Sequence, residues 1–401
     1  MDNAAPPVVD DLEARVADFL ERHGGLMADQ VAFRGAQYDA GLAFVHFPVG
    51  LGGLGLPLTR QALVDEKLRD AGCTYHNLRL NPVGIGMVAP TILEYGTEQQ
   101  KRRFLRPLFT GEEVWCQLFS EPGAGSDLAG LAARATWEDG TWVVNGQKVW
   151  NSLAHVASFG VLLARTDPDL PKHQGISYFL LDMRLPGIES RPLVQMTGVA
   201  EFNEVFLDDV HVPDDAMLGG RGDGWRIATT TLMSERAMLS GGAGGRGTGP
   251  VRTLLNLWAR RRDALGEAER AIRRDQLADI WLRAEVVRLQ GQRAKAMSRS
   301  VPGAYHSIGK LMWTELHQEI YEFCVDLEGA DGMLHEAGYP LARADQLSST
   351  PSISSQFLRS RASTLEGGTS EILRNMLGER LLDLPGEPRT DKNVSWRDIP
   401  R

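Results

Sequence analysis

The most informative part of the sequence is Cys116-Gln117-Leu118-Phe119-Ser120-Glu121-Pro122-Gly123-Ala124-Gly125-Ser126-Asp127. A hydrophobic run over 114–119 ends at the polar pair Ser120-Glu121, and one proline and two glycines follow at once. This composition predicts a tight, exposed backbone turn. Such a turn leaves backbone N–H groups and the hydroxyls of Ser120 and Ser126 free to face a flat or anionic ligand.

A second signal follows about twenty residues later, in the stretch Asn145-Gly146-Gln147-Lys148-Val149-Trp150-Asn151-Ser152. Asn-Gly is typical of a hairpin turn, so we expect Trp150 and Ser152 on one face of the strand that follows it, two residues apart. Either half alone is also typical of a surface hairpin. The two stretches in this order and spacing therefore carry more information than either one.

The composition limits the class of protein. The chain has 401 residues and 43% hydrophobic content, which predicts two or three packed domains. A charged fraction of 24% and a net charge of −9 indicate a mildly acidic globular protein. This balance argues against a surface that binds nucleic acid or an anionic membrane, so any site for an anionic ligand has to be local.

The cysteines and the N-terminus bear on the compartment. Cys73, Cys116 and Cys324 form no CxxC pair and are odd in number, which favours buried free thiols in a reducing cytoplasm. We predict no metal site. The N-terminal residues are acidic and resemble neither a signal peptide nor a basic presequence, and no apolar run approaches about 18 residues. These features predict a cytoplasmic globular enzyme or subunit.

The first part of the chain is predicted to be helical. Thr97, with Gln100 three residues on, is typical of a helix N-terminal cap. The run Gly50-Leu51-Gly52-Gly53-Leu54-Gly55 is too rich in glycine for a helix and lacks the Lys-Ser/Thr of a phosphate-binding loop, so we expect a structural loop. The predicted helices span residues 8–24, 59–71, 81–95 and 99–109.

Short strands replace the helices from Val114 onward and predict a small β-barrel or sandwich. The expected strands span residues 135–137, 142–144, 159–164, 176–181 and 204–213. The pattern is helical again over residues 223–262, 266–298, 301–329 and 352–383. Within the first of these, six of the nine residues from Gly241 to Gly249 are glycine, so we expect close packing over 241–245 and a local break near Gly249-Pro250.

The chain resembles the acyl-CoA dehydrogenases over about residues 10 to 385, both in the two motifs and in the order of a helical, a β and a second helical region. The resemblance implies a multi-domain α+β fold. Its expected parts are an N-terminal α-helical domain (1–112), a middle β-barrel domain (113–222), a C-terminal four-helix bundle (223–385) and a polar C-terminal arm (386–401).

The resemblance also implies a reaction. The expected substrate is an acyl-CoA, or an acyl thioester on a carrier protein, that is dehydrogenated between Cα and Cβ with FAD as the cofactor. A glutamate takes the α-proton, flavin N5 takes the β-hydride, and the electrons pass to an electron-transfer flavoprotein.

Flavin contacts are implied for residues of both motifs. Phe119 and Ser120 match positions that touch the isoalloxazine ring, Trp150 matches an indole that lies on the flavin, and Ser152 matches a hydroxyl near N5. Ser126 matches a residue shared by the flavin phosphate and the acyl-CoA. The other implied cofactor-binding residues are Gly125, Gly329, Gly332, Thr369 and Glu371.

The base is expected at an alternate position. The family's usual base lies in a Glu-Gly-Thr-Ser stretch, and aligning Gly-Thr-Ser here places Gly367 at that position, with Glu366 one residue early. One residue on a helix-entering backbone rotates a side chain by about 100°. Isovaleryl- and long-chain-type members carry the base on a distant helix instead, where Glu235 matches it; Glu366 is the runner-up. Arg236 and Gly367 are implied substrate contacts, with the Gly367 backbone N–H bonding the thioester oxygen.

Two family patterns are missing from the sequence. Residues 254–273 lack the Arg-x-x-Phe-Gly element whose arginine reaches the flavin pyrophosphate of an adjacent subunit, and Arg246, Arg260 or Arg293 are candidate substitutes. Residues 197–203 lack the usual Arg-x-Ser-x-Thr. The expected assembly is a homotetramer or dimer, with a heterotetramer as an alternative.

Two other functions stay open. One is a partner subunit of a heteromeric acyl-CoA dehydrogenase with an incomplete flavin or catalytic site. The other is an oxygen-using oxidase or monooxygenase on the same fold, against which Glu235 and the complete turn argue. The alternate base position mildly favours bulky or branched acyl groups.

Overall fold

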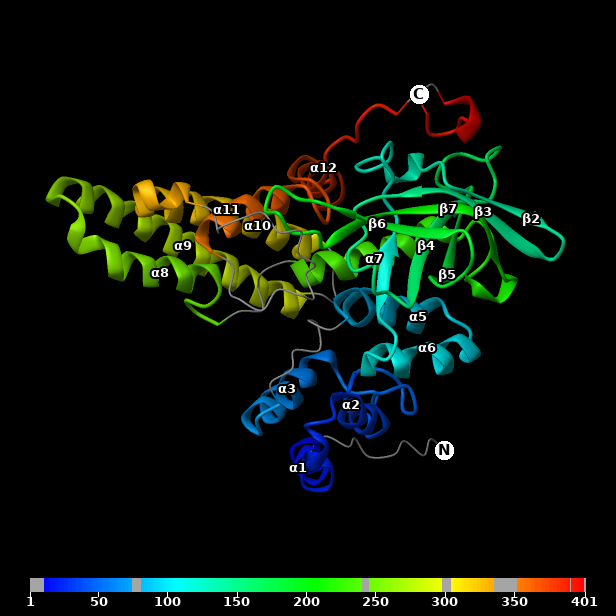
Figure 1. The fold of residues 1–401 in the computed structure, drawn as a ribbon, viewed down its shortest axis with the longest axis horizontal. Coiled ribbons are helices and arrows are strands. Elements are labelled where there is room, and N and C mark those ends of the chain that lie inside the picture. Colours follow the sequence, from blue (N-terminus) through cyan, green and yellow to red (C-terminus); the bar gives the residue numbers. More distant parts are fainter. Residues whose placement is uncertain are drawn as a thin grey trace.

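The computed structural model describes residues 11–73, 81–239, 245–297, 304–334, 352–389 and 391–399. It shows the multi-domain α+β architecture expected from the sequence. Figure 1 places a group of N-terminal helices below a β-sheet domain and the long C-terminal helices to one side of it. Among the described residues, no helix combines the length and apolar content needed to cross a bilayer.

The N-terminal region is helical, as predicted. Thr97 and Gln100 form the expected cap, because the Gln100 N–H donates to Thr97 Oγ1 at 3.1 Å and the Thr97 N–H donates to Gln100 Oε1 at 3.0 Å. The glycine-rich segment is a loop, as expected, and a Cβ at Gly53 would lie 2.1 Å from the Phe47 carbonyl oxygen. The helices are α1 (Leu12–His23), α2 (Gln30–Asp39), α3 (Gln61–Asp70), α5 (Ala89–Tyr95) and α6 (Glu98–Thr110), with a π-helical turn (Gly84–Val88) before α5.

The middle region is one eight-stranded sheet in the order β6-β7-β3-β2-β4-β5-β8, with β1 pairing β4 in parallel. Its strands are β1 (Trp115–Leu118), β2 (Arg134–Glu138), β3 (Thr141–Lys148), β4 (Phe159–Arg165), β5 (Ile176–Asp182), β6 (Ile188–Leu193), β7 (Phe202–Val212) and β8 (Met217–Leu218). The sequence reading missed β6 and β8, which are short or largely exposed.

The hairpin predicted at Asn145-Gly146 is wrong. These residues lie inside β3, which pairs with β7 through an irregularity between Val144 and Gly146. The true turn is Asp139-Gly140, between β2 and β3. A glycine is needed at position 146 because the backbone passes close to Ala133, where a Cβ would lie 2.5 Å from the Ala133 Cβ.

The C-terminal region contains more breaks than expected. The helix predicted over 223–262 divides at a non-helical segment in which Gly247 and Gly249 have φ of 64° and 60°, so the break near Gly249-Pro250 is confirmed. Of the close packing predicted over 241–245, residues 241–244 lie outside the described residues. The helices are α7 (Gly224–Leu239), α8 (Pro250–Arg261), α9 (Glu267–Met297), α10 (Ala304–Glu328), α11 (Ile353–Ser360) and α12 (Ser370–Leu381).

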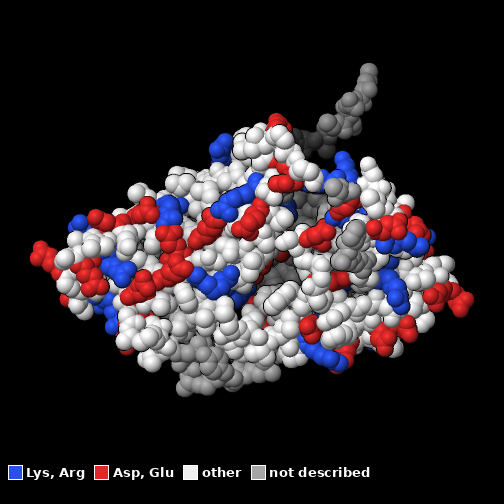
Figure 2. Space-filling model, turned by 90° about the horizontal axis from the view of Figure 1, so that it is seen from above, with Lys and Arg blue, Asp and Glu red and all other residues white. Residues whose placement is uncertain are grey.

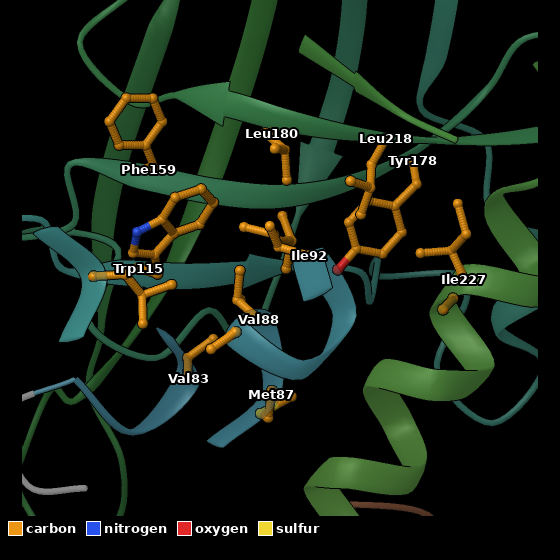
Figure 3. Close-up of a cluster of buried hydrophobic side chains, with 14 of the residues drawn as sticks. Val83, Met87, Val88, Ile92, Trp115, Phe159, Tyr178, Leu180, Leu218 and Ile227 are labelled. Carbon is orange, nitrogen blue, oxygen red and sulfur yellow. The ribbon is translucent and has the colours of Figure 1, made fainter. Parts of the chain in front are cut away.

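A shared core joins the three regions. Val88 and Ile92 from the N-terminal helices, Trp115 and Tyr178 from the sheet, and Ile227 from α7 pack in one buried cluster (Figure 3). Three hydroxyls within this interface bond in a chain: Tyr178 to Thr231 at 3.1 Å, and Thr231 to Thr91 at 3.0 Å. Buried hydroxyls satisfied in this way fix how the helices sit on the sheet.

The surface charges, the cysteines and the C-terminal arm can be compared with the expectations from the sequence. Basic and acidic side chains are interspersed over the face seen in Figure 2, without a broad patch of one sign. Cys116 and Cys324 are buried free thiols as predicted, whereas Cys73 is only half-buried. Part of the expected polar arm docks on the sheet domain, where the Trp396 N–H donates to the Leu170 carbonyl at 3.0 Å.

Candidate active site

The glycine-rich turn is held by hydrogen bonds on its buried side and is exposed on the other. Glu121 and Ala124 exchange backbone hydrogen bonds at 3.0 Å. The buried Glu121 carboxylate accepts the N–H groups of Ala132 and Ala133 and pairs with the fully buried Lys148 ammonium at 2.8 Å. Residues 125–127 face outward. Sequence reasoning did not include Glu121 and Lys148 in the site; a lysine inside a predicted strand was the available signal.

Open space lies beside the turn. Cβ atoms at Gly123 and Gly125 would meet no atom within 4 Å. A cavity of about 650 Å³ opens here, and its lining includes Pro122, Lys172 and, from the C-terminal arm, Trp396. Lys172 is held by Asp127 at 3.0 Å and by Asp391 of the arm at 2.6 Å. The docked arm therefore forms one wall of the cavity.

Trp150 lies next to this turn, although not on a strand as predicted. Strand β3 ends at Lys148, and Trp150 follows in a bend with φ of 62°. The Val149 N–H donates to the Ser120 carbonyl at 2.9 Å, which brings the two motifs side by side. Trp150 is 60% exposed, and its indole packs edge-on against Phe202, with ring centroids 5.9 Å apart. A large, exposed aromatic face of this kind can hold a flat ring.

The segment after Trp150 is well anchored but leaves one acceptor unused. Asn151 donates through Nδ2 to the Gln117 carbonyl at 2.7 Å, and its backbone exchanges hydrogen bonds with Asn203. Its buried Oδ1 has no partner among the described residues. Ser152 follows, half-buried. Buried acceptors are rarely left unsatisfied, so this oxygen fits a site that receives a donor from a ligand.

Glu235, Gly367 and Lys310 meet, although they come from α7, the loop before α12 and α10. A Cβ built at Gly367 would lie 3.8 Å from Glu235 Oε1 and 3.6 Å from Lys310 Cε. Gly367 has a φ of 65°, in the left-handed region that favours glycine. The Glu235 carboxylate thus faces the backbone position at which the aligned motif would carry its glutamate.

Burial decides the ionisation of Glu235. Desolvation raises the pKa of this carboxyl to about 7, the Glu366 carboxylate adds to the rise, and Arg236 and Lys310 oppose it. A carboxyl with a pKa near neutrality can exchange a proton at physiological pH.

Glu366 is engaged elsewhere. Its two carboxylate oxygens accept from the Arg359 guanidinium at 3.3 and 3.0 Å, and Arg359 also donates to Glu201 at 2.9 Å. The same guanidinium lies over the Phe202 ring, 5.6 Å from its centroid. Arg359 therefore ties the loop that carries Gly367 to the ring that supports Trp150.

Arg236 lies beside the Gly367 loop, because its Nη2 is 3.9 Å from a Cβ position at Gly368. Its Nη1 lies 3.5 Å from the Met376 sulfur, and burial lowers the pKa of the guanidinium. Its Nε is buried without a partner among the described residues. A donor remains available to a polar ligand.

The remaining predicted cofactor residues fall in two places. Thr369 caps α12 by accepting the Ile372 N–H at 3.2 Å, which places Thr369 and Glu371 next to the Gly367 loop. Gly329 and Gly332 follow the far end of α10. With a rise of about 1.5 Å per residue they lie roughly 28 Å along the helix from Lys310, so the chain does not bring them to Glu235.

Helical, β and helical regions follow one another in this order, with an exposed tryptophan beside a glycine-rich turn, as the resemblance to the acyl-CoA dehydrogenases implies. Comparison with known families agrees. Residues 8–112, 116–210 and 222–382 match the N-terminal, middle and C-terminal domains of acyl-CoA dehydrogenase, respectively. The chain belongs to the acyl-CoA dehydrogenase family, whose members are FAD-dependent enzymes.

Relatives are found in Mycobacterium tuberculosis. Acyl-CoA dehydrogenase FadE34 is 42% identical over 352 residues, which cover 86% of this chain but only 45% of FadE34, so the chain spans less than half of that protein. Acyl-CoA dehydrogenase IpdE1 is 37% identical, with 87% of this chain and 86% of IpdE1 covered.

Among solved structures, the ChsE4-ChsE5 complex from the same organism has a TM-score of 0.70 at 27% identity, covering 96% of this chain and 100% of that chain. The Tcur3481-Tcur3483 steroid ACAD has a TM-score of 0.71 at 26% identity, with the same coverage.

Proposed function

We propose that this chain catalyses α,β-dehydrogenation of an acyl-CoA, or of a carrier-bound acyl thioester, with Glu235 as the base. The supporting observation is that the Glu235 carboxylate lies 3.8 Å from a Cβ position at Gly367 and has a pKa raised to about 7. A general base is most effective when its pKa lies near the working pH. Glu366, the other candidate, is bound by Arg359.

The residues beside the turn fit FAD. A flat ring with polar edges and a phosphate-bearing tail suits the exposed Trp150, the unused acceptor of Asn151 and the open space at Gly125. We infer that Phe119, Ser120, Trp150 and Ser152 hold the ring, and that Gly125 and Ser126 hold the phosphate end. FAD bound there supplies the acceptor for the β-hydride.

The thioester is held by the loop opposite Glu235. The backbone N–H of Gly367 is the proposed donor to the thioester carbonyl oxygen, because it belongs to the residue that the carboxylate faces. A donor at this oxygen stabilises the negative charge that develops as the α-proton leaves. Arg236 and Ser126 complete the proposed substrate contacts.

In a multi-subunit assembly, Gly329 and Gly332 could contact the flavin of a neighbouring subunit. Because Gly329 and Gly332 lie roughly 28 Å from Lys310, we infer that they serve the flavin of another subunit, while Thr369 and Glu371 meet the adenosine end of a flavin. The absence of Arg-x-x-Phe-Gly from residues 254–273 favours a second candidate function, in which this chain is one subunit of a heteromeric enzyme. Relatives studied as the paired chains ChsE4-ChsE5 and Tcur3481-Tcur3483 support it.

The substrate class and acceptor are also proposals. The alternate base position and the steroid ACAD relative favour a bulky acyl group, including a steroid-derived one. We infer that electrons leave to an electron-transfer flavoprotein.

The test is the visible spectrum of the protein purified alone, followed by anaerobic addition of short-chain, branched and steroid side-chain acyl-CoAs. We expect flavin absorption that bleaches with a bulky thioester. A colourless chain that acquires flavin only with a partner supports the heteromeric candidate. Bleaching by none of the thioesters, alone or with a partner, contradicts both functions, and hydrogen peroxide production under air would indicate an oxidase.

A further inference from the structure

Lys310 is a buried cation beneath the proposed catalytic loop. Its side chain on α10 is fully buried, and its ammonium donates to the carbonyls of Ser363 at 3.1 Å and Gly368 at 2.7 Å. These two carbonyls bracket Gly367 in sequence. One side chain therefore fixes the backbone on both sides of the residue that faces Glu235.

The end of the Lys310 side chain lies near the Glu235 carboxylate. Lys310 Cε and Glu235 Oε1 lie 3.6 and 3.8 Å from one Cβ position at Gly367, so they are at most about 7.4 Å apart, the sum of those distances. At this separation, in a partly desolvated site, opposite charges interact strongly enough to shift a protonation equilibrium.

The other charges around the site are largely paired. Arg236, the next residue on α7, lowers the Glu235 pKa more than Lys310 does. Burial lowers the pKa of Arg236 itself, and Arg380 on α12 adds to that shift. Glu366 is bound by Arg359, and Glu315 on α10 by Arg374. A buried ammonium that donates to two neutral carbonyls still requires an opposite charge. Burial lowers the Lys310 pKa, and the carboxylates of Glu366 and, to a lesser extent, Glu235 oppose this shift. Glu366 already pairs with Arg359, whereas no ion pair joins Glu235 to another of the described residues.

We propose that Lys310 is a positioning residue for proton abstraction, which holds the Gly367-Gly368 turn against Glu235 and stabilises the ionised form of that carboxylate. The proposal rests on the proposed role of Glu235. A residue of α10 would thus help to set both the position and the charge of a base on α7.

The test follows the Glu235 carboxyl directly. Flavin-loaded protein labelled with [5-¹³C]glutamate is titrated by carbon NMR, and the signal missing from E235Q identifies Glu235. Replacing the cation by a neutral side chain in K310M and K310Q is expected to raise the Glu235 pKa by at least about one unit. K310R keeps the charge and is expected to titrate near the wild type.

T314V is the matched control. Thr314 lies one turn further along α10, is buried, and donates to the Lys310 carbonyl at 2.9 Å, so its replacement perturbs the same helix without changing its charge. A Glu235 pKa unchanged in K310M and K310Q, or shifted equally in T314V, would overturn the proposal.

Anaerobic flavin reduction by an acyl-CoA that bleaches the wild type gives a second readout. In K310M the pH profile should move upward with the NMR titration. If no acyl-CoA bleaches the wild type, the proposed function fails, yet the NMR titration still decides whether Lys310 controls Glu235.

Discussion

The raised pKa of Glu235 has a measurable cost in stability. Its folded pKa of about 7 lies above the model-peptide value of 4.5. Between these values the unfolded chain releases the proton and the folded chain keeps it, so stability falls as pH rises through this window. With about 1.36 kcal/mol per unit, the loss reaches about 3 kcal/mol above pH 7, an upper value because solvent screening reduces it.

Glu235→Gln removes this penalty. The expected difference between variant and wild type is small at pH 5 and grows to at most about 3 kcal/mol at pH 8. For 401 residues unfolding together, with about 2.1 cal/mol/K each, this is a rise in Tm of roughly 4 °C. Scanning calorimetry of the flavin-loaded protein without substrate measures it at both pH values.

Glu366→Gln is the matched control. This substitution removes the carboxylate that pairs with the Arg359 guanidinium, so we expect it to lower Tm at pH 8. The change is opposite in sign to the one expected for E235Q. A Tm difference between E235Q and wild type that is the same at pH 5 and pH 8 would refute the reasoning, because it would mean that Glu235 titrates alike in the folded and unfolded chain.

Three further substitutions test the surrounding site. Trp150→Ala should weaken FAD binding about tenfold in a flavin titration, whereas Trp137→Ala, another exposed tryptophan, should not. Lys148→Met leaves a buried carboxylate unpaired beneath the turn and should cost about 3 to 5 kcal/mol in urea unfolding; an unchanged midpoint would argue against the pair. Gly367→Ala places a methyl 2.6 Å from Leu239 Cδ1, on the helix that carries Glu235, so the loop or that helix must shift, and we expect kcat/KM to fall at least about tenfold. Gly50→Ala, with a similar positive φ but open space, should cost about 1 kcal/mol in stability and leave kcat/KM unchanged.

Local sequence signals predicted much of the fold. The cap at Thr97 and Gln100 depends on residues three apart, and the strand series depends on short runs, so both could be identified without distant contacts. The hairpin prediction was wrong because the sequence contains two Xaa-Gly pairs that are each typical of a turn. Asp139-Gly140 turns the chain, whereas pairing with β7, some sixty residues away, keeps Asn145-Gly146 within a strand.

The site depended on distant contacts that periodicity does not report. The helix expected over 352–383 is interrupted where Lys310, more than fifty residues earlier, takes the carbonyls of Ser363 and Gly368. Sequence spacing suggested that Glu366 points away but could not identify Arg359 as its partner. Family resemblance indicated the Glu235 position, whereas the raised pKa follows from packing that only the fold provides.

Proton abstraction in two variants decides between Glu235 and Glu366 as the base. An acyl-CoA that reduces the wild-type flavin is mixed rapidly and anaerobically with wild type, E235Q and E366Q, while exchange of its α-protons with D₂O is followed by NMR. We expect E235Q to slow flavin reduction at least about 10²- to 10⁴-fold and to abolish exchange, and E366Q to retain both. Exchange that survives in E235Q and disappears in E366Q would contradict this expectation.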